Sequence, residues 1–292
     1  LNVQGSNENT VTSTAVTSIF NQEFGGATPF GLDTSKVSLN NNYTEARATM
    51  NDASNSLTIQ GGATLSATGA LTNVQGSAGG SATAEATGTI QYLLNGDNTP
   101  ASANSSISAS NNTVVAAARG NTATNVLNAT AGAAYTGLPT TGASTSVSDP
   151  GGPTQSLVAS ASYAVLNSQT NTSDLTARVT GGVSVSLAGG NGVTSSASSV
   201  SVMGNRFEAS AIGNSATNLL TSSALGTGMP SMALTSVQRN TGNAITAEAT
   251  GVRIGVTLVG VGSTGGTSAI SGNSISASAT GNSVVNRIGF SN

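Results

Sequence analysis

This 292-residue sequence contains no cysteine, no histidine and no tryptophan, and only 7% of its residues are charged. Without these residues the chain forms no disulfide, no Ser-His-Asp or Cys-His catalytic group, and no zinc, haem or iron–sulfur site. Its 8 basic and 11 acidic residues give a net charge of −3, which provides no basic surface for nucleic acid. No run of about 20 apolar residues is present, so we expect no membrane span.

Small residues dominate what is present, chiefly Ser, Thr, Ala, Gly and Asn. Such a composition raises disorder as an alternative. A hydrophobic fraction of 37%, only 6 prolines and a strong positional order all favour a folded chain instead. The first residues, LNVQGSNENT, show neither the charged region nor the apolar region of a signal peptide. If the protein is exported, we therefore expect this sequence to be the mature form.

Four segments align without gaps and share the pattern N-x-x-x-A-x-A-x-(G/M)-N-x-(A/V)-x-N-x-Φ, where Φ is apolar. Every copy keeps three asparagines, and three of the copies keep a Gly-Asn pair. We expect these residues to form ladders or corners of a repetitive fold. They are Asn42, Asn51, Asn55, Asn112, Gly120, Asn121, Asn125, Asn205, Gly213, Asn214, Asn218, Asn273, Gly281, Asn282 and Asn286.

A recurring tripeptide sets the length of the repeat. It reads NVQ at Asn2 and Asn73, NSQ at Asn167 and SVQ at Ser236, so its position number increases by 71, 94 and 69. The unit is therefore about 70 residues long, and the sequence predicts one domain over 1–292. Its repeats are approximately 1–72, 73–166, 167–235 and 236–292, and the second carries about 24 extra residues. Because a stacked fold accepts a whole additional turn, we expect an inserted coil near 138–157.

A shorter spacing is present inside the unit. Small-x-small-x-Gly elements, or their equivalents, end at Met50, Gly69 and Gly88, so the position number increases by 19 each time. This spacing predicts coils of about 18 residues, several per unit. The predicted fold is an all-β β-solenoid (β-helix) of about four ~70-residue repeats, with roughly sixteen coils and a length of about 75 Å.

Strand patterning supports that fold. Segments such as TAEATGTIQYLL from Thr83 alternate small apolar side chains with Thr, Glu or Gln at period two. Small inward residues indicate a narrow core. We expect Gly-Asn pairs at corners, where left-handed backbone is needed, and equivalent asparagines stacked into hydrogen-bonded ladders.

The motifs GNTATN, GNSATN and GNSVVN, which begin at Gly120, Gly213 and Gly281, resemble curlin-type repeats of bacterial surface fibres. Fibres of the curli and holdfast-attachment kind are built from such units. The similarity is confined to the asparagine-containing segment of each of the four copies. It implies an exported fibre-forming or adhesive protein at a bacterial surface, with cell-surface anchor proteins or polysaccharide as further candidate partners.

The open ends of a solenoid need a cap or a partner. The sequence shows no capping segment, and extending the repeat beyond Asn273 brings a second copy almost into register. We therefore expect head-to-tail association, the geometry that forms filaments. The alternative is a monomer whose ends are covered by a partner or by loops such as 20–34. The expected interface residues in the terminal coils are Asn2, Val3, Gln4, Val284, Val285 and Ile288.

The sequence gives little evidence for a catalytic, metal-binding or ice-binding site. Glu85, Arg178 and Glu248 share one repeat position, and exchange of Glu for Arg favours a solvated outer row over a catalytic carboxylate. The aspartates are scattered and form no DxD motif, GGxGxD calcium turns are missing, and regular TxT rows of ice-binding solenoids are nearly absent. We expect no enzyme activity, no metal and no cofactor.

The leading hypothesis is a structural subunit of an extracellular filament or adhesive surface fibre that assembles with itself head to tail. The alternative is a binding module, namely a monomeric or trimeric rod-like stalk of an adhesin or phage tail fibre.

Overall fold

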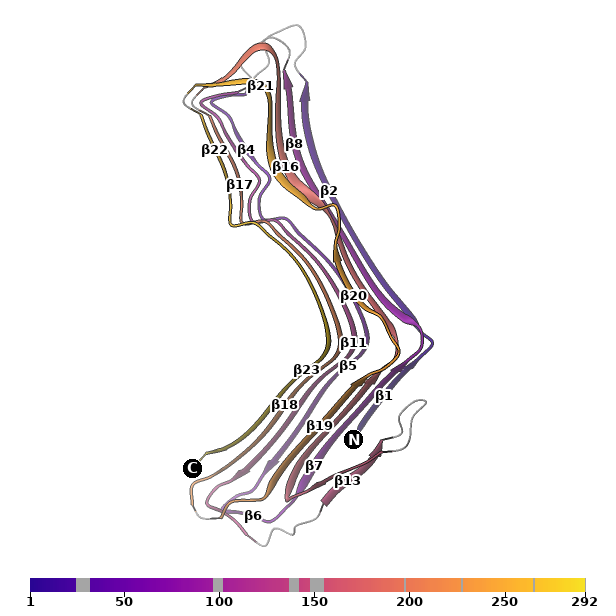
Figure 1. The fold of residues 1–292 in the computed structure, drawn as a ribbon. Coiled ribbons are helices and arrows are strands. Elements are labelled where there is room, and N and C mark those ends of the chain that lie inside the picture. The colour runs from indigo at the N-terminus through magenta and orange to yellow at the C-terminus, as the bar shows by residue number, and fades with distance from the viewer. Residues whose placement is uncertain are drawn as a thin grey trace.

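The computed structural model describes residues 1–24, 32–96, 102–136, 142–147, 155–196, 198–226, 228–264 and 266–291. Every regular element in these ranges is a β-strand, so the described part of the chain contains no helix that could cross a membrane. The chain winds through four successive turns, which we call coils, and each coil lies on the previous one (Figure 1).

The strands are grouped by coil as follows. Coil 1 contains β1 (Asn2–Asn7), β2 (Thr10–Phe24), β3 (Leu32–Asp33), β4 (Lys36–Ser38), β5 (Tyr43–Gln60) and β6 (Thr64–Leu65). Coil 2 contains β7 (Gly69–Ala78), β8 (Ser81–Gly96), β9 (Ser102–Ala103), β10 (Ser106–Ser108), β11 (Thr113–Ala131) and β12 (Ala134–Tyr135). A hairpin follows, made of β13 (Gly142–Val147) and β14 (Gln155–Ser160). Coil 3 contains β15 (Tyr163–Asn171), β16 (Asp174–Ser196), β17 (Ser199–Met203) and β18 (Arg206–Ala224). Coil 4 contains β19 (Met232–Asn240), β20 (Ile245–Ala249), β21 (Arg253–Thr264), β22 (Thr267–Ser271) and β23 (Ser274–Ser291).

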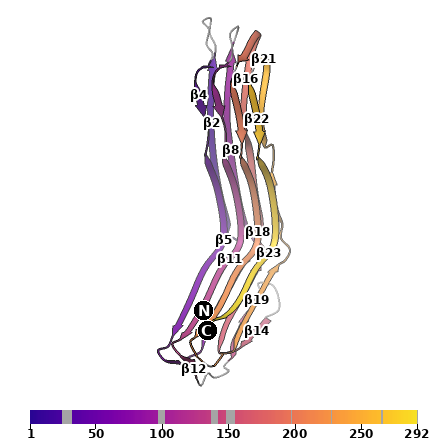
Figure 2. The same cartoon turned by 90° about the vertical axis from the view of Figure 1, so that its left-hand side faces the viewer.

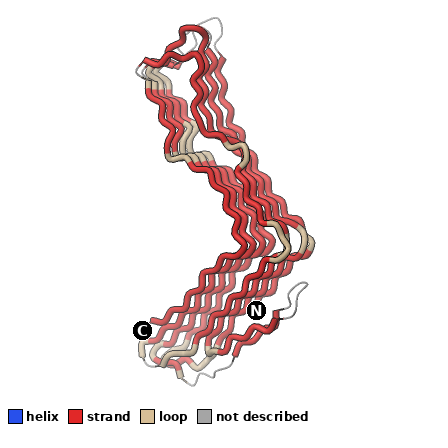
Figure 3. The backbone as a smooth tube through the Cα atoms, viewed as in Figure 1, coloured by secondary structure: helices blue, strands red, loops and turns tan. Residues whose placement is uncertain are grey.

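The coils stack as parallel sheets in the register that the sequence repeat predicts. Asn2 pairs with Asn73, Asn73 with Asn167, and Asn167 with Ser236. The same register joins β5, β11, β18 and β23 into one sheet and β2, β8, β16, β20 and β21 into another. The predicted all-β solenoid of four repeats is confirmed (Figure 3).

The predicted division of each repeat into several short coils is wrong. Gly88 pairs with Thr17 and Gly181, and Gly69 pairs with Tyr163, so neither stacks on the similar element that precedes it in the sequence. One coil contains a whole repeat of about 70 residues, because the strands that form its sides are long. β16 alone has 23 residues. Similar small residues recur in β5, in the segment that joins β6 to β7, and in β8, all at different places in the stack, and this recurrence produced the shorter spacing. Four coils at about 4.8 Å place the first and last only about 15 Å apart.

Each coil is flattened and bent, so the molecule has two arms that meet at an elbow (Figures 1 and 2). The upper arm encloses a core of small and aliphatic side chains such as Ala84, Ala116 and Val185. The lower arm encloses a second core around Leu127, Tyr163 and Leu220. In both arms alternate residues of each strand point inward, as period-two patterning predicts.

The extra residues of the second repeat do not form an inserted coil. The described part of this segment is the antiparallel hairpin β13–β14, which packs outside the solenoid against β7, β15 and β19. Residues 137–141 and 148–154 lie outside the described ranges. β15 is consequently buried on both faces, and Leu166 on its outer side is 1% exposed. An excursion between coils leaves the stacking register intact, which explains why the repeat resumes unchanged at Asn167.

Candidate functional site

The first asparagine of each repeated segment forms a column at a corner of the coil. Asn42 donates from Nδ2 to Oδ1 of Asn112 at 2.8 Å, Asn112 to Asn205 at 2.8 Å, and Asn205 to Asn273 at 2.9 Å. The preceding residue has a positive φ in every coil, which Gly and Asn adopt most readily. These residues are Asn41, Asn111, Gly204 and Gly272. At this column the prediction of corner asparagines is confirmed.

The second and third asparagines form two more columns, which lie at the elbow, within the long strands β5, β11, β18 and β23. Each side chain again donates from Nδ2 to Oδ1 of its equivalent in the next coil. The distances are 2.7 Å for Asn51–Asn121 and Asn121–Asn214, 2.9 Å for Asn214–Asn282, and 2.8 Å for Asn55–Asn125, Asn125–Asn218 and Asn218–Asn286.

Gly120, Gly213 and Gly281 do not lie at corners, contrary to the prediction, and none has a positive φ. They lie inside strands at the elbow, where the inward-facing alternation shifts by one residue. A Cβ on Gly120 would lie 2.8 Å from Oδ1 of Asn171 on the opposite wall and closer still to the carbonyl oxygen of Gly213. Glycine is therefore needed for close approach rather than for a left-handed turn.

A column of glutamines also lies at the elbow, and apart from Gln4 it was not predicted. Gln75 donates from Nε2 to Oε1 of Gln4 at 2.8 Å, Gln169 to Gln75 at 2.7 Å, and Gln238 to Gln169 at 2.7 Å. Asn2, Asn73 and Asn167 form a neighbouring column at 2.8 and 2.9 Å. The signal was available, because these residues are the first and third positions of the recurring NVQ-like tripeptide.

The remaining N–H of many elbow amides bridges the coil from wall to wall. Asn121 donates to the carbonyl oxygen of Thr170 at 2.8 Å, Gln75 to that of Thr122 at 2.9 Å, and Asn125 to Oδ1 of Asn167 at 3.2 Å. We call the four columns that begin at Asn2, Gln4, Asn51 and Asn55 the elbow amide cluster. Its side chains hydrogen-bond along the stack and across it, so a buried polar layer joins the two apolar cores.

At the open face of coil 4, side chains that point toward the inside of the coil are partly exposed, because no further coil covers them. Leu258, Ile270, Ile275, Val284 and Ile288 are 46–52% exposed. Their stacked equivalents in coil 3 are only 0–2% exposed; these are Leu187, Val202, Phe207, Ala216 and Leu220. The face of coil 1 presents half-buried residues, among them Leu39 and Leu57.

The expected interface residues are divided between the end faces and the outer surface. Asn2 and Gln4 belong to the elbow amide cluster at the coil 1 face, and Val284 and Ile288 belong to the coil 4 face. Val3 and Val285 point outward beside these faces, and both are exposed. The sequence therefore identified the correct coils but not the direction of every side chain.

Charged side chains lie on the outer surface, as expected for the row of Glu85, Arg178 and Glu248. Nε of Arg178 lies 2.9 Å from Glu248, and its Nη1 lies 3.8 Å from Glu85, so opposite charges alternate from coil to coil. Such exposed pairs contribute little stability, but they avoid stacking of like charges.

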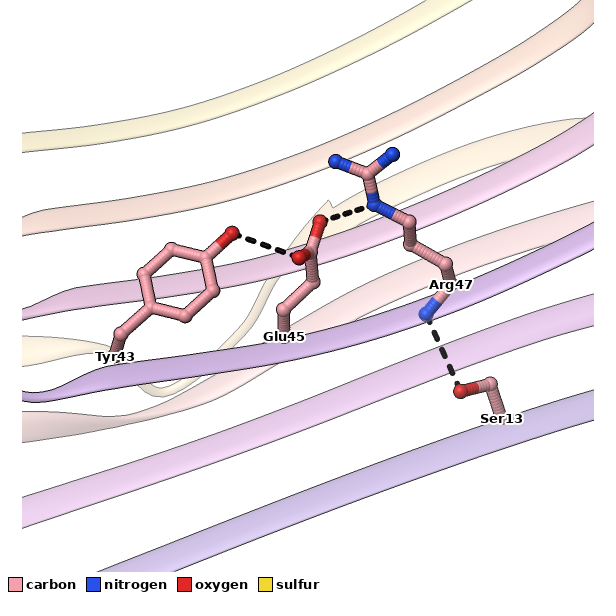
Figure 4. Close-up of polar contacts among 4 residues, drawn as sticks. All are labelled: Ser13, Tyr43, Glu45 and Arg47. Carbon is pink, nitrogen blue, oxygen red and sulfur yellow. Dashed lines mark hydrogen bonds and ion pairs between the residues drawn. The ribbon is translucent and has the colours of Figure 1, made fainter.

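A second charged group lies on the outside of coil 1 (Figure 4). The Tyr43 hydroxyl donates to Glu45 at 2.8 Å, Arg47 forms an ion pair with Glu45, and the Arg47 backbone N–H donates to Oγ of Ser13 at 3.2 Å. The hydrogen bond from Arg47 lowers the pKa of Glu45, whereas the hydrogen bond to Glu45 raises the pKa of Tyr43. In the lower core, burial raises the pKa of Tyr163 to about 12.

Comparison with known protein families, curated proteins and solved structures finds no match to this chain. The functional argument therefore depends on the amide columns and the two end faces.

Proposed function

We propose that this chain is a structural subunit of an extracellular filament or adhesive surface fibre and that it assembles head to tail through its terminal coils. The observation that carries the proposal is the open face of coil 4. Five inward apolar side chains there remain about half exposed, although their equivalents one coil below are buried. Covering this apolar surface with another coil would stabilise the contact.

The sheet edges support the same proposal. β1, β2, β4 and β5 form one edge of the stack, and β19, β20, β21, β22 and β23 form the other. Edge strands present backbone N–H and C=O groups that can pair with another strand. Because all coils share one register, coil 1 of a second copy fits on coil 4 as each coil of the chain fits on the one before it.

The dimensions favour a filament over a stalk made from one copy. Along the stack, the four coils span only about 15 Å, whereas an 18-residue strand such as β5 follows a bent path of about 60 Å across it. These four coils therefore form a flat slab, and greater length along the stack requires further coils. The monomeric or trimeric stalk remains the competing proposal, and it requires the end faces to be covered by something other than this chain.

Location at a bacterial surface is supported by the resemblance of the GN(T/S) motifs to curlin-type repeats and by the scarcity of charge. A role in adhesion follows from the same resemblance, with surface anchor proteins or polysaccharide as candidate partners. The amide columns supply hydrogen bonds rather than reactive groups, which accords with a structural role and not with catalysis.

Electron microscopy of the purified chain tests the proposal, and we expect unbranched filaments many copies long. Ile288→Lys places a charge on the coil 4 face where the side chain is 52% exposed, so the fold tolerates it but the contact does not. The matched control is Val285→Lys, which points outward and stays solvated after assembly.

We expect Ile288→Lys to abolish filaments and Val285→Lys to retain them. Deletion of 267–292, which removes β22 and β23, should also abolish them. Undiminished filaments from Ile288→Lys, or uniform short particles from the unmodified chain, would contradict the proposal.

A further inference from the structure

We propose that the elbow amide cluster allows a second copy to dock in one orientation and one register only. This inference rests on the proposed head-to-tail assembly and identifies the residues that determine its polarity. The basis is that the asparagine and glutamine columns donate in opposite directions along the same stack.

The asparagine columns donate toward coil 4. In the elbow columns that begin at Asn51 and Asn55, and in the corner column that begins at Asn42, each Nδ2 group in coils 1 to 3 gives one N–H to the Oδ1 of the next coil. The coil 4 face therefore presents the corresponding N–H of Asn273, Asn282 and Asn286. The coil 1 face presents the matching acceptors, which are the Oδ1 atoms of Asn42, Asn51 and Asn55.

The glutamine column donates toward coil 1. Oε1 of Gln4, Gln75 and Gln169 each accepts an N–H from the next coil. Oε1 of Gln238 is shielded from solvent and has no hydrogen-bond partner among the residues that the structure describes. Gln4 gives one N–H to the Asp52 carbonyl oxygen at 3.0 Å, and an amide carries two. The second N–H of Gln4 from an incoming copy is therefore the group that Gln238 lacks.

Contacts between like ends would leave amide groups unpaired. A coil 4 face presents N–H groups of three asparagines but one glutamine acceptor, Oε1 of Gln238, and a coil 1 face presents three Oδ1 acceptors but one glutamine donor, Gln4. Two like faces therefore leave most of these groups buried without a partner, which costs free energy and disfavours such contacts. Only coil 1 of one copy on coil 4 of another satisfies both column types.

The same groups determine the register. A slip of one residue turns the inward side chains outward. A slip of two residues keeps the faces but places Asn286 opposite Ala53 or Leu57 instead of Asn55. Contact in register places Ser54 of the incoming copy beside Val285, because Ser54, Thr124, Thr217 and Val285 form one outward row.

Cysteine cross-linking tests this arrangement, and the chain has no native cysteine to interfere. Ser54→Cys and Val285→Cys are combined in one chain; both positions are exposed. Neighbouring parallel strands place register partners about 4.8 Å apart, within disulfide range. The matched control combines Ser56→Cys with Val285→Cys, which separates the partners by about 8 Å, beyond that range.

We expect mild oxidation to convert the Ser54→Cys, Val285→Cys variant into a denaturant-resistant series of multimers, at least tenfold more than the control gives. Each single variant should give no covalent dimer.

As a second measurement, Gln4→Leu should raise the protein concentration needed for assembly about tenfold, since Gln238 stays unpaired. Val3→Ala, on the outer side of the same strand, should leave this concentration unchanged.

The outcomes separate this inference from the proposed function. Filaments in the microscope together with equal cross-linking by the control, or with covalent dimers of a single variant, would overturn the polarity and register while leaving self-assembly intact. Normal assembly of Gln4→Leu would overturn the role of the glutamine column. Absence of both filaments and cross-links would overturn the proposed function and this inference with it.

Discussion

A buried asparagine in this molecule has two hydrogen-bonding tasks, one along the stack and one across the coil. Asn121 shows both, because it accepts from Asn51, donates to Asn214 and also donates to the carbonyl oxygen of Thr170. The carbonyl is on the opposite wall, at the elbow, where the alternation of β11 shifts. The amide thus satisfies backbone groups that the bend would otherwise leave buried without a partner.

We expect Asn121→Ala to lower the free energy of unfolding by about 3 kcal/mol, since it leaves several buried groups unpaired. Urea unfolding followed by circular dichroism measures this change. Thr124→Ala is the matched control, because Thr124 is exposed on the same strand; its effect should stay within about 0.5 kcal/mol. Equal effects of the two substitutions would show that the column does not stabilise the fold.

The asparagine columns could be predicted from the sequence because their spacing is identical in four copies. The role of the glycines could not be predicted, since a Gly-Asn pair is equally compatible with a left-handed backbone at a corner and with close approach of two strands. Gly204 before Asn205 illustrates the first, with a φ of 66°, and Gly120 before Asn121 illustrates the second. The structure distinguishes them by the backbone φ and by the closeness of Gly213 and Asn171 to the Gly120 position.

At the scale of elements, the hairpin β13–β14 covers the outer side of β15, and β15 carries a hydrophobic residue at the covered position. Leu166 is buried under the hairpin, whereas Thr72 and Thr235 occupy the same row in the adjacent coils. Among coils 2 to 4, a hydrophobic residue in this row therefore occurs only in the strand that the hairpin covers on its outer side. The hairpin covers part of the outer surface of the solenoid, and its two strands pair with each other.

We expect deletion of 137–160 to preserve the solenoid, because it shortens the link between β12 and β15 to the length of the link between β6 of coil 1 and β7 of coil 2. The variant should lose about 2 kcal/mol of unfolding free energy and aggregate, since Leu166 becomes exposed. Adding Leu166→Thr, the residue type of the adjacent coils, should restore solubility, as measured by light scattering. Complete unfolding of the deletion variant by circular dichroism would contradict this account.

Strand type and the long repeat could be predicted from the sequence, but the number of coils per repeat could not. Inward positions of β5 and β8 use the same small residues, and a similar motif, LSATG at 65–69, lies where β6 is joined to β7. Separate parts of one coil therefore look like successive coils in the sequence. The repeat predicts pairing between residues a whole unit apart, but it does not show where the chain bends within a coil. That information is held in the elbow contacts rather than in local patterning.

At the scale of the whole molecule, assembly would continue the parallel sheets without interruption, with every strand perpendicular to the filament axis. We expect fibre diffraction to show a reflection at about 4.8 Å along that axis. An additional axial repeat of about 19 Å should accompany it, because one hairpin marks every four coils. Loss of the longer repeat in the 137–160 deletion is the control, and a reflection at about 4.8 Å across the axis would contradict head-to-tail stacking.

The hairpin β13–β14 would also recur on one side of such a filament, because every copy stacks in the same register. The spacing between successive hairpins, about 19 Å, would be determined by the four coils of each copy. A ligand with two groups that bind the hairpin, joined by a linker of matching length, would meet the second hairpin at a high effective concentration after binding the first. The insertion that interrupts the repeat would therefore set the valency of the fibre surface.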